Sequence, residues 1–282
     1  MKIVECPRDA MQGIKNIIPT RLKITYLQHL LSVGFHTLDF GSYVSARAIP
    51  QMADTPQVLE AIDLSQTSTK LLAIVANLRG AEQTTLQEKI SYVGFPLSLS
   101  ETFQQRNTHK SIAEAFTELD HIQNLCQKRN KTLVTYLSMG FGNPYRDPWD
   151  AETVLRFVQS LVDMDIRIIS LADTVGVAQA TDIQYLFSQL IPAFPAIEFG
   201  AHLHVQPLNW QEKVEAAVAA GCTRFDGAIK GYGGCPMALD SLTGNLATEN
   251  LVAYFENIGV PLNINKKAFE TALTLAGTVF TS

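Results

Sequence analysis

The sequence predicts an α/β fold, a (β/α)8 or TIM barrel, and three observations support this. The chain has 282 residues, close to the roughly 250 that fill a barrel of this kind. Short β-branched or aromatic runs alternate regularly with longer stretches of helical period, which indicates a parallel sheet. No GxGxxG fingerprint follows the first strand, so eight repeats favour a closed barrel over an open dinucleotide-binding sheet.

The expected strands are nearly continuous in apolar residues, as strands covered on both faces should be. They are expected at 2–5, 37–41, 70–76, 90–95, 132–138, 167–172, 197–203 and 223–229.

The expected helices lie between these strands. Ser111 and Asp150 are suited to helix N-termini, and Gly34 and Gly221 lie where a helix should stop. Helices are expected at 20–33, 54–63, 80–88, 110–128, 149–163, 178–192, 209–220, 246–258 and 265–279. No linker marks a second domain, so we expect a single TIM-barrel catalytic domain over 1–282, with a C-terminal helical extension over about 246–282.

The composition bounds the partners and the compartment. The formal charge of −5 argues against nucleic acid or an anionic membrane as the main partner. No apolar run approaches the length of a membrane span, and the N-terminus lacks signal-peptide order. The cysteines, Cys6, Cys126, Cys222 and Cys235, form no CxxC pair, which favours a reduced, cytoplasmic protein.

Polar side chains gather where the expected strands end. In a (β/α)8 barrel the carboxyl ends of the strands carry the active site, so we expect these side chains to converge at one rim. They are Arg8, Asp9, Asp39, Asn77, Ser138, Asp173, His202, His204 and Asp226.

His202 and His204 are the clearest pair. Alternate residues of a strand point to the same face, so both imidazoles face the same way. Two imidazoles and a carboxylate suit a divalent transition metal, and Mg²⁺ fits if oxygen ligands complete an octahedron. Two polar side chains hydrogen-bonded beneath a loop are the simpler alternative, but the place of the pair at a strand end facing Asp9 favours ligation.

Cys235 and Arg8 each have a functional and a structural interpretation. Cys235 follows two glycines in GYGGCPMA (231–238), where a cysteine can donate or accept a proton, although most free cysteines are small buried apolar residues. Arg8 follows a buried strand and needs an anionic partner. It either pairs with Asp39 or Asp226, or stabilises a developing enolate oxygen, and both roles can coexist.

Seven motifs, in order, make the chain resemble the 3-hydroxy-3-methylglutaryl-CoA (HMG-CoA) lyase family of metal-dependent TIM-barrel lyases and synthases. The resemblance runs from about residue 2 to 258. The motifs are ECPRDAMQ (5–12), SYVSARAIPQM (42–52), NLRG (77–80), ISLADTVGV (169–177), AHLH (201–204), GGCP (233–236) and GNLATENL (244–251).

The resemblance implies a role for individual residues. The metal, Mg²⁺ or Mn²⁺, would be held by Asp9, His202, His204 and Asn245. The catalytic set would be Arg8, which polarises the thioester carbonyl, Asp9, His202, the acid/base Cys235, Asp39 and Asp173. The substrate surroundings would be Arg8, Gln12, Ser42, Ser45, Asn77 and Ser138.

The family reaction is a retro-Claisen cleavage of HMG-CoA to acetyl-CoA and acetoacetate, a step of leucine degradation. The resemblance therefore implies an acyl-CoA substrate, a carbon–carbon lyase and a homodimer. One alternative is a Claisen-type synthase of the isopropylmalate or homocitrate kind, in which an acyl-CoA condenses with a 2-oxo acid. The other is a barrel that has lost catalysis and serves as a binding protein.

Three departures from the family pattern cluster at the expected mouth. Val205 and Gln206 follow His204 where the better-known lyases carry an acid and then Thr-Tyr, and Asp39 stands where they carry glutamate. Nine residues (236–244), among them Asp240, separate Cys235 from Asn245, one more than the pattern. These changes bear on the substrate more than on the reaction, so a lyase for a related 3-hydroxyacyl thioester is a further alternative.

Overall fold

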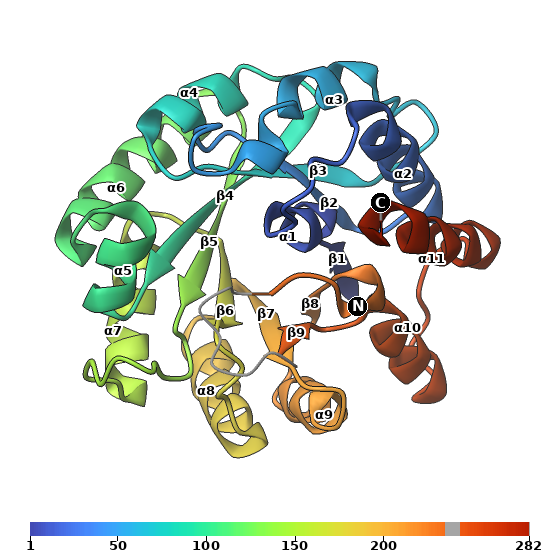
Figure 1. The fold of residues 1–282 in the computed structure, drawn as a ribbon. Helices are drawn as coiled ribbons and strands as arrows, with labels where there is room; N and C mark the ends of the chain where they lie inside the picture. Colours follow the sequence, from blue (N-terminus) through green and yellow to red (C-terminus); the bar gives the residue numbers. More distant parts are fainter. Residues whose placement is uncertain (235–242, 282) are drawn as a thin grey trace.

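A computed structural model describes residues 1–234 and 243–281 and confirms the barrel (Figure 1). Eight parallel strands pair in the order β6-β5-β4-β3-β2-β1-β8-β7, and the pairing of β6 with β7 closes the ring. The strands are β1 Lys2–Glu5, β2 Thr37–Ser42, β3 Lys70–Ile74, β4 Ile90–Ser98, β5 Thr132–Ser138, β6 Ile168–Asp173, β7 Glu198–Val205 and β8 Arg224–Gly227. The eight predicted strands are therefore confirmed, with ends that shift by up to three residues.

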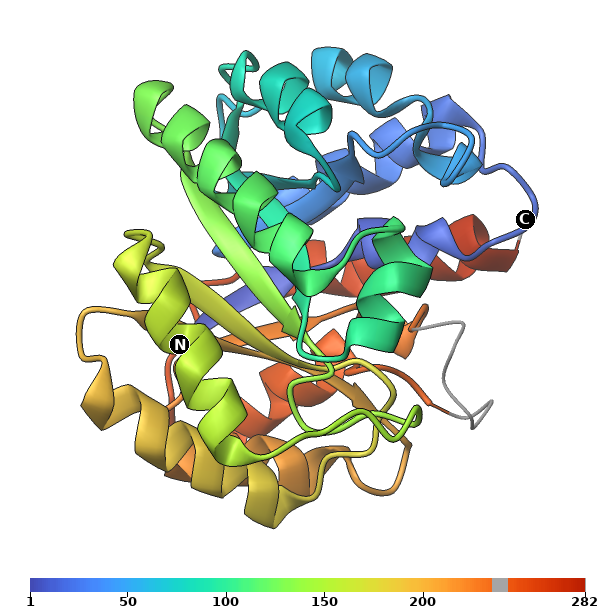
Figure 2. The same cartoon turned by 90° about the vertical axis from the view of Figure 1, so that its left-hand side faces the viewer.

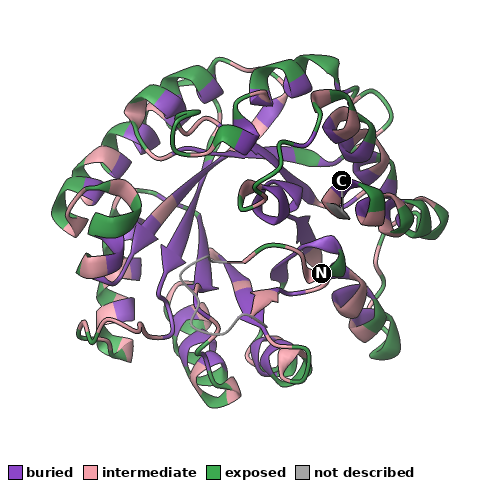
Figure 3. Cartoon of the chain, in the orientation of Figure 1, coloured by how far each residue is buried: buried purple, intermediate pink, exposed green. Residues whose placement is uncertain are grey.

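The helices form a layer around this barrel. They are α1 Pro7–Gln12, α2 Thr20–Val33, α3 Thr55–Ala61, α4 Leu78–Thr85, α5 Glu101–Thr108, α6 Ile112–Lys128, α7 Ala151–Asp163, α8 Ala180–Ala193, α9 Trp210–Ala219, α10 Thr248–Asn257 and α11 Lys266–Thr281, with short 3-10 turns at Pro50–Met52 and Ile229–Gly231. Figure 3 shows their inner faces and the strands buried and their outer faces exposed. The core is therefore the layer between strands and helices.

Local sequence signals set several helix ends as expected. The Ser111 side chain accepts from the backbone N–H of Glu114 in a capping box, and Asp150 accepts from that of Thr153. Gly34 ends α2 with a φ of 84°, a left-handed conformation that glycine adopts without steric cost.

The C-terminal helices have two different positions. Helix α10 follows β8, whereas α11 lies between α10 and α2 and packs along α2 (Figure 1). Edge-to-face aromatic pairs fix that contact, Tyr26 with Phe280 and Phe35 with Phe269. Of these two C-terminal helices, only α11 is therefore additional to the regular barrel.

Two short elements that the sequence did not predict stand at the carboxyl ends of the strands. Helix α1 follows β1 directly, and Pro7 supplies the fixed φ that suits a first helical turn. Strand β9, Gly244–Asn245, pairs antiparallel with β7 and sets Asn245 opposite His204. Figure 2 shows the N-terminus on one side and the connections after the strands on the other, which gives the barrel a distinct mouth. None of the described helices is long and apolar enough to cross a membrane.

Candidate active site

Helix α1 carries Arg8 and Asp9 over the mouth of the barrel. Their side chains are each only 10% exposed, so both charges need partners. The Arg8 Nε donates to the Asp39 carboxylate at 3.0 Å, and Nη2 lies 2.5 Å from the same group. Nη1 donates to Asp9 at 3.0 Å and to Gln12 at 2.9 Å. Every nitrogen of this guanidinium therefore donates a hydrogen bond. The expected ion pair with Asp39 is present, and the place of Arg8 at the cavity is also compatible with stabilisation of an enolate oxygen.

The two carboxylates beside Arg8 have different proton affinities. Burial raises the pKa of Asp39 to about 6, although Arg8 opposes that effect. Burial also acts to raise the pKa of Asp9, but the charges of Arg8, His202 and His204 outweigh it and lower the pKa to about 2. Asp9 is thus ionised at neutral pH, whereas the pKa of Asp39 lies near the range in which a carboxyl group exchanges protons at neutral pH.

His202 and His204 come from β7 and face the same space, with ring centroids 5.2 Å apart. The Nδ1 of His204 donates to the backbone carbonyl of Thr174 at 2.7 Å. Because a carbonyl can only accept, the proton is on Nδ1 and the lone pair on Nε2. That Nε2 atom is buried and has no hydrogen-bond partner in the described part of the chain, so its lone pair can bind a metal ion.

His202 is oriented in the same way by a carboxylate. Its Nδ1 lies 3.1 Å from Asp226 Oδ2. Burial acts to lower the pKa of His202, but the hydrogen bond and charge of Asp226, with the charge of Asp9, raise it overall. For His204 burial and the neighbouring His202 lower the pKa. Carboxylate and carbonyl partners of this kind orient metal-binding imidazoles.

Donor atoms of Asp9, His202 and His204 all lie within 4.8 Å of one another, and two imidazoles with a carboxylate fit a divalent cation. Asn245 lies beside them, and its Nδ2 donates to Asp9 Oδ2 at 2.7 Å and to the Tyr232 carbonyl at 2.8 Å. To act as a ligand, this amide would have to turn its oxygen toward the cluster. The four predicted metal ligands are thus brought together from α1, β7 and β9.

A second group, Cys6, His202 and Asp226, is equally compact. Burial raises the pKa of the Cys6 thiol far above its usual range, and a thiol binds metal only as thiolate. This group therefore fits a metal less well than the first.

The remaining predicted site residues divide between the cavity and its support. Gln12 and Ser138 line the cavity. Asn77 instead caps α4 by accepting from Gly80 N, and Ser42 donates to the Ile74 carbonyl. Ser45 accepts from Ala48 N near the surface.

Asp173 also stands apart from the cluster. The carboxylate of Asp173 turns to the helix layer and pairs with Lys213 at 2.7 Å, because Ala172 takes the inward position on β6. Cys235 lies outside the described residues, and the neighbouring Gly234 lines the cavity.

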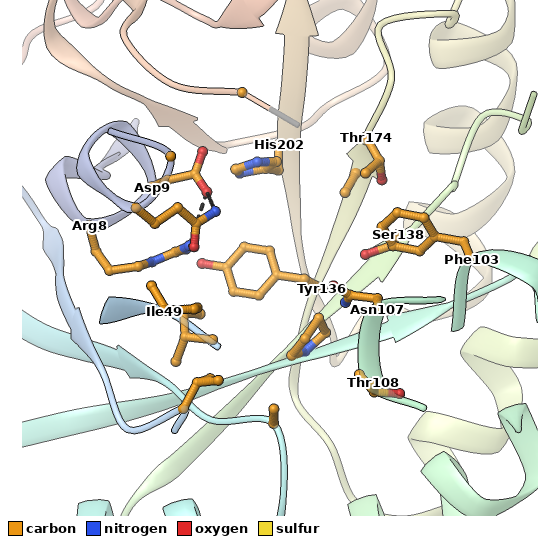
Figure 4. A pocket seen from close by; sticks show the side chains of 18 of the residues that line it. Arg8, Asp9, Ile49, Phe103, Asn107, Thr108, Tyr136, Ser138, Thr174 and His202 are labelled. Atoms are coloured by element: carbon orange, nitrogen blue, oxygen red, sulfur yellow. Dashed lines mark hydrogen bonds and ion pairs between the residues drawn. The ribbon is translucent and has the colours of Figure 1, made fainter. Parts of the chain in front are cut away.

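The cavity in front of the cluster has a volume of about 400 Å³. Figure 4 shows Arg8, Asp9 and His202 on one side of it and Phe103, Asn107 and Thr108 on the other. The apolar part of the lining includes Val44, Ile49, Ile74, Pro96 and Phe103. Such a shape suits a ligand with a polar, anionic end and an apolar remainder.

Sequence reasoning missed two contributors to this cavity. Helix α5 supplies Phe103, Asn107 and Thr108, and the only signal for it was Ser100, whose side chain accepts from Phe103 N at its start. Tyr136 is buried, and its hydroxyl has no hydrogen-bond partner among the described residues. Figure 4 shows this hydroxyl pointing toward the side that holds Arg8. Its place on the inward face of the predicted strand 132–138 was the available signal.

The fold and the site define a (β/α)8 barrel with a histidine–carboxylate cluster at the carboxyl ends of its strands. The model of the HMGL-like family matches residues 2–275, and the chain belongs to this family of lyases and synthases, which are generally metal-dependent. Hydroxymethylglutaryl-CoA lyase YngG of Bacillus subtilis is 34% identical over 258 residues, which cover 92% of this chain and 85% of that protein.

Solved structures agree with this assignment. An HMG-CoA lyase structure from Bacillus subtilis has a TM-score of 0.93 at 31% identity and covers all of this chain and 94% of that one. An HMG-CoA lyase from an Acinetobacter, in complex with coenzyme A and 3-methylmalate, has a TM-score of 0.91 at 28% identity, with all of this chain and 91% of that one covered.

Proposed function

We propose that the protein is a divalent-metal-dependent carbon–carbon lyase that cleaves HMG-CoA into acetyl-CoA and acetoacetate. The observation that carries the proposal is the convergence of Asp9, His202 and His204 on the wall of a cavity that also presents Arg8. Nε2 of His204 has no hydrogen-bond partner among the described residues. The similarity to HMG-CoA lyases supports the choice of substrate.

The metal site would consist of Asp9, His202, His204 and the amide oxygen of Asn245. A bound Mg²⁺ or Mn²⁺ would supply Lewis-acid polarisation there, which lowers the pKa of the substrate hydroxyl. The related Acinetobacter lyase was solved with coenzyme A and 3-methylmalate. Like HMG-CoA, 3-methylmalate carries a hydroxyl on the carbon β to a carboxylate, so it is compatible with such a site.

The chain's own residues would guide the bond cleavage. A base removes the hydroxyl proton, the carbonyl of acetoacetate forms, and the electrons of the broken C–C bond pass to the thioester as an enolate. Arg8 would stabilise the charge on the thioester oxygen, which is the role of a preorganised cation. Asp39, with its pKa near 6, is suited to proton exchange. Cys235 would return a proton to the enolate carbon.

The other predicted residues would act on the substrate or on the frame. Gln12 and Ser138 line the cavity and would contact the acyl group, whereas Asp173, Asn77, Ser42 and Ser45 would hold the loops around it. We also expect a single catalytic domain, a homodimer and a cytoplasmic location. Sedimentation velocity measures whether the protein is a homodimer.

The test is acetyl-CoA release from HMG-CoA by purified protein. We expect turnover with Mg²⁺ or Mn²⁺, its loss on chelation and its return when metal is restored. His202→Ala should abolish it, and His121→Ala, which removes an exposed histidine of α6, should not. Turnover unchanged by a chelator would overturn the metal mechanism. Thiol release from acetyl-CoA with a 2-oxo acid, in place of lyase activity, would identify a synthase.

A further inference from the structure

Lys213 is a buried lysine in α9 that none of the motifs includes. Its side chain is 1% exposed, and its neighbours on the buried face of the helix are Val214, Ala216 and Ala217. A buried ammonium is costly unless all of its donors are used. Here they are used, because Nζ donates to Asp173 Oδ2 at 2.7 Å, to the His204 carbonyl at 3.1 Å and to the Gly176 carbonyl at 3.2 Å.

These acceptors belong to the two segments that shape the histidine end of the candidate metal site. Asp173 and Gly176 stand at the two ends of the turn that follows β6, and the carbonyl that orients His204 belongs to Thr174, between them. The third acceptor is the backbone of His204 itself. Lys213 thus joins the turn after β6 to strand β7. The position of that turn relative to the strand sets the orientation of the His204 ring.

The same turn is held on its other sides as well. Asp173 Oδ1 accepts from Ala178 N at 3.1 Å, so the carboxylate links Lys213 to the start of α8. A Cβ at Gly176 would come within 2.6 Å of the Thr243 side chain, so the turn lies against the residue that precedes β9. A shift of the turn would therefore reach both His204 and the strand that carries Asn245.

Val205 lies at the same end of β7 but gives the turn no polar side-chain contact. The residue after His204 is apolar, 7% exposed and packed in the core, so its side chain offers no hydrogen bond to the turn. Lys213 provides a polar anchor at this end of β7, with three hydrogen bonds and a charge matched by Asp173.

We propose that Lys213 is a positioning residue of the metal site: through Asp173 and Gly176 it holds the turn after β6 so that Thr174 directs Nε2 of His204 toward Asp9 and His202. The inference rests on the proposed function, because it takes these three side chains as metal ligands. Lys213 does not line the cavity and acts only through other groups.

The test compares two buried lysines in the intact protein. Lys23 of α2 is 3% exposed and pairs with Asp54 at 2.8 Å, away from the cluster, so Lys23→Met removes an equivalent buried ion pair. We expect both Lys213→Met and Lys23→Met to lower the melting temperature. Only Lys213→Met should weaken Mn²⁺ binding, measured from the electron paramagnetic resonance signal of the free ion, by about 10- to 100-fold.

A second pair of variants covers the case in which Lys213→Met does not fold. Lys213→Arg keeps the charge opposite Asp173 but replaces a compact ammonium by a broader guanidinium, so it should fold and displace the turn. We expect an altered visible spectrum of bound Co²⁺ and weaker Mn²⁺ binding, whereas Lys23→Arg should match the wild type in both.

The outcomes separate this inference from the proposed function. Wild-type protein that binds no Mn²⁺ would overturn the metal site itself. Wild-type binding, together with affinities within about twofold and an unchanged Co²⁺ spectrum in every folded Lys213 variant, would overturn the role of Lys213 alone.

Discussion

The Nδ1 atom of His202 lies 3.1 Å from Oδ2 of Asp226, a carboxylate that is only 1% exposed. Asp226 comes from β8 and does not line the cavity. It would therefore act on a bound metal ion only through the imidazole of His202. The carboxylate fixes the orientation of the imidazole ring and makes Nε2, the other ring nitrogen, a stronger electron-pair donor to a metal ion.

Asp226→Asn is therefore expected to weaken Mn²⁺ binding by about 10- to 100-fold. The amide retains the shape but loses the charge that favours a basic imidazole. Titration calorimetry with Mn²⁺ measures the effect, and Asp120→Asn on the exposed side of α6 is the control. Equal affinities for the two variants would contradict the prediction.

The pair of Arg8 and Asp39 should be strongly non-additive. Arg8→Met leaves the buried Asp39 carboxylate without its cation and is expected to cost about 3–5 kcal/mol of unfolding free energy. The double variant Arg8→Met/Asp39→Asn should recover part of that loss, because the buried carboxylate of Asp39 is then replaced by a neutral amide. Urea unfolding of the wild type, both single variants and the double variant measures the coupling, and additive losses would argue against it.

Gly233→Ala should damage the candidate site through the backbone. Gly233 has a φ of +87°, and a Cβ there would lie 2.7 Å from the Asp9 carbonyl and 2.9 Å from Asn245 Nδ2. Gly259 shares a positive φ of +73° but has no atom within 4 Å of such a Cβ. Gly259→Ala therefore controls for backbone strain, and only Gly233→Ala should lose Mn²⁺ affinity, by about tenfold or more.

Glu5 should make the stability of the fold depend on pH. Burial raises its pKa from 4.5 to about 8, although its carboxylate accepts from Thr248 and from Ile229 N. The folded state therefore binds the proton more tightly than the unfolded chain. The stability that this proton contributes is complete below about pH 4.5 and is lost as the pH rises to about 8.

Glu5→Gln should flatten this dependence. The contribution amounts to about 1.4 kcal/mol for each pKa unit by which folding raises the pKa. Urea unfolding at pH 5 and pH 8 measures it, with Glu270→Gln on the exposed face of α11 as the control. Parallel pH dependences for the wild type and Glu5→Gln would show that Glu5 is not the cause.

The strands could be predicted because a parallel sheet covered on both faces leaves continuous apolar runs in the sequence. Helices α1 and α5 could not, because six residues (PRDAMQ) and eight (ETFQQRNT) are too short or too polar to show an apolar face. Their positions depend on tertiary contacts, such as those of Arg8 with Asp39 and of Phe103 with the cavity.

The cluster of Asp9, His202 and His204 could be predicted because the two histidines alternate on one strand and therefore share a face. The direction of other strand-end residues could not. Asp173 follows Ala172 by one position, and that single step turns its carboxylate from the cavity to Lys213. Asn77 and Ser42 lie beside the mouth as expected, but Asn77 accepts a hydrogen bond at the start of α4 and Ser42 donates one to the end of β3. Lys213 gave only a weak signal, a single cation on the apolar side of a helix.

The contact between Asn245 and Asp9 spans 236 residues of the chain. The two side chains can meet only after β1, β7 and β9 have all taken their places, so the cluster is complete only when the ring has closed. A metal that requires this contact is expected to bind after the rate-limiting step of folding, leaving the refolding rate almost unchanged and slowing unfolding instead. Occupancy of the site would then govern how long a folded molecule survives, and the speed of its formation would be set by the chain alone.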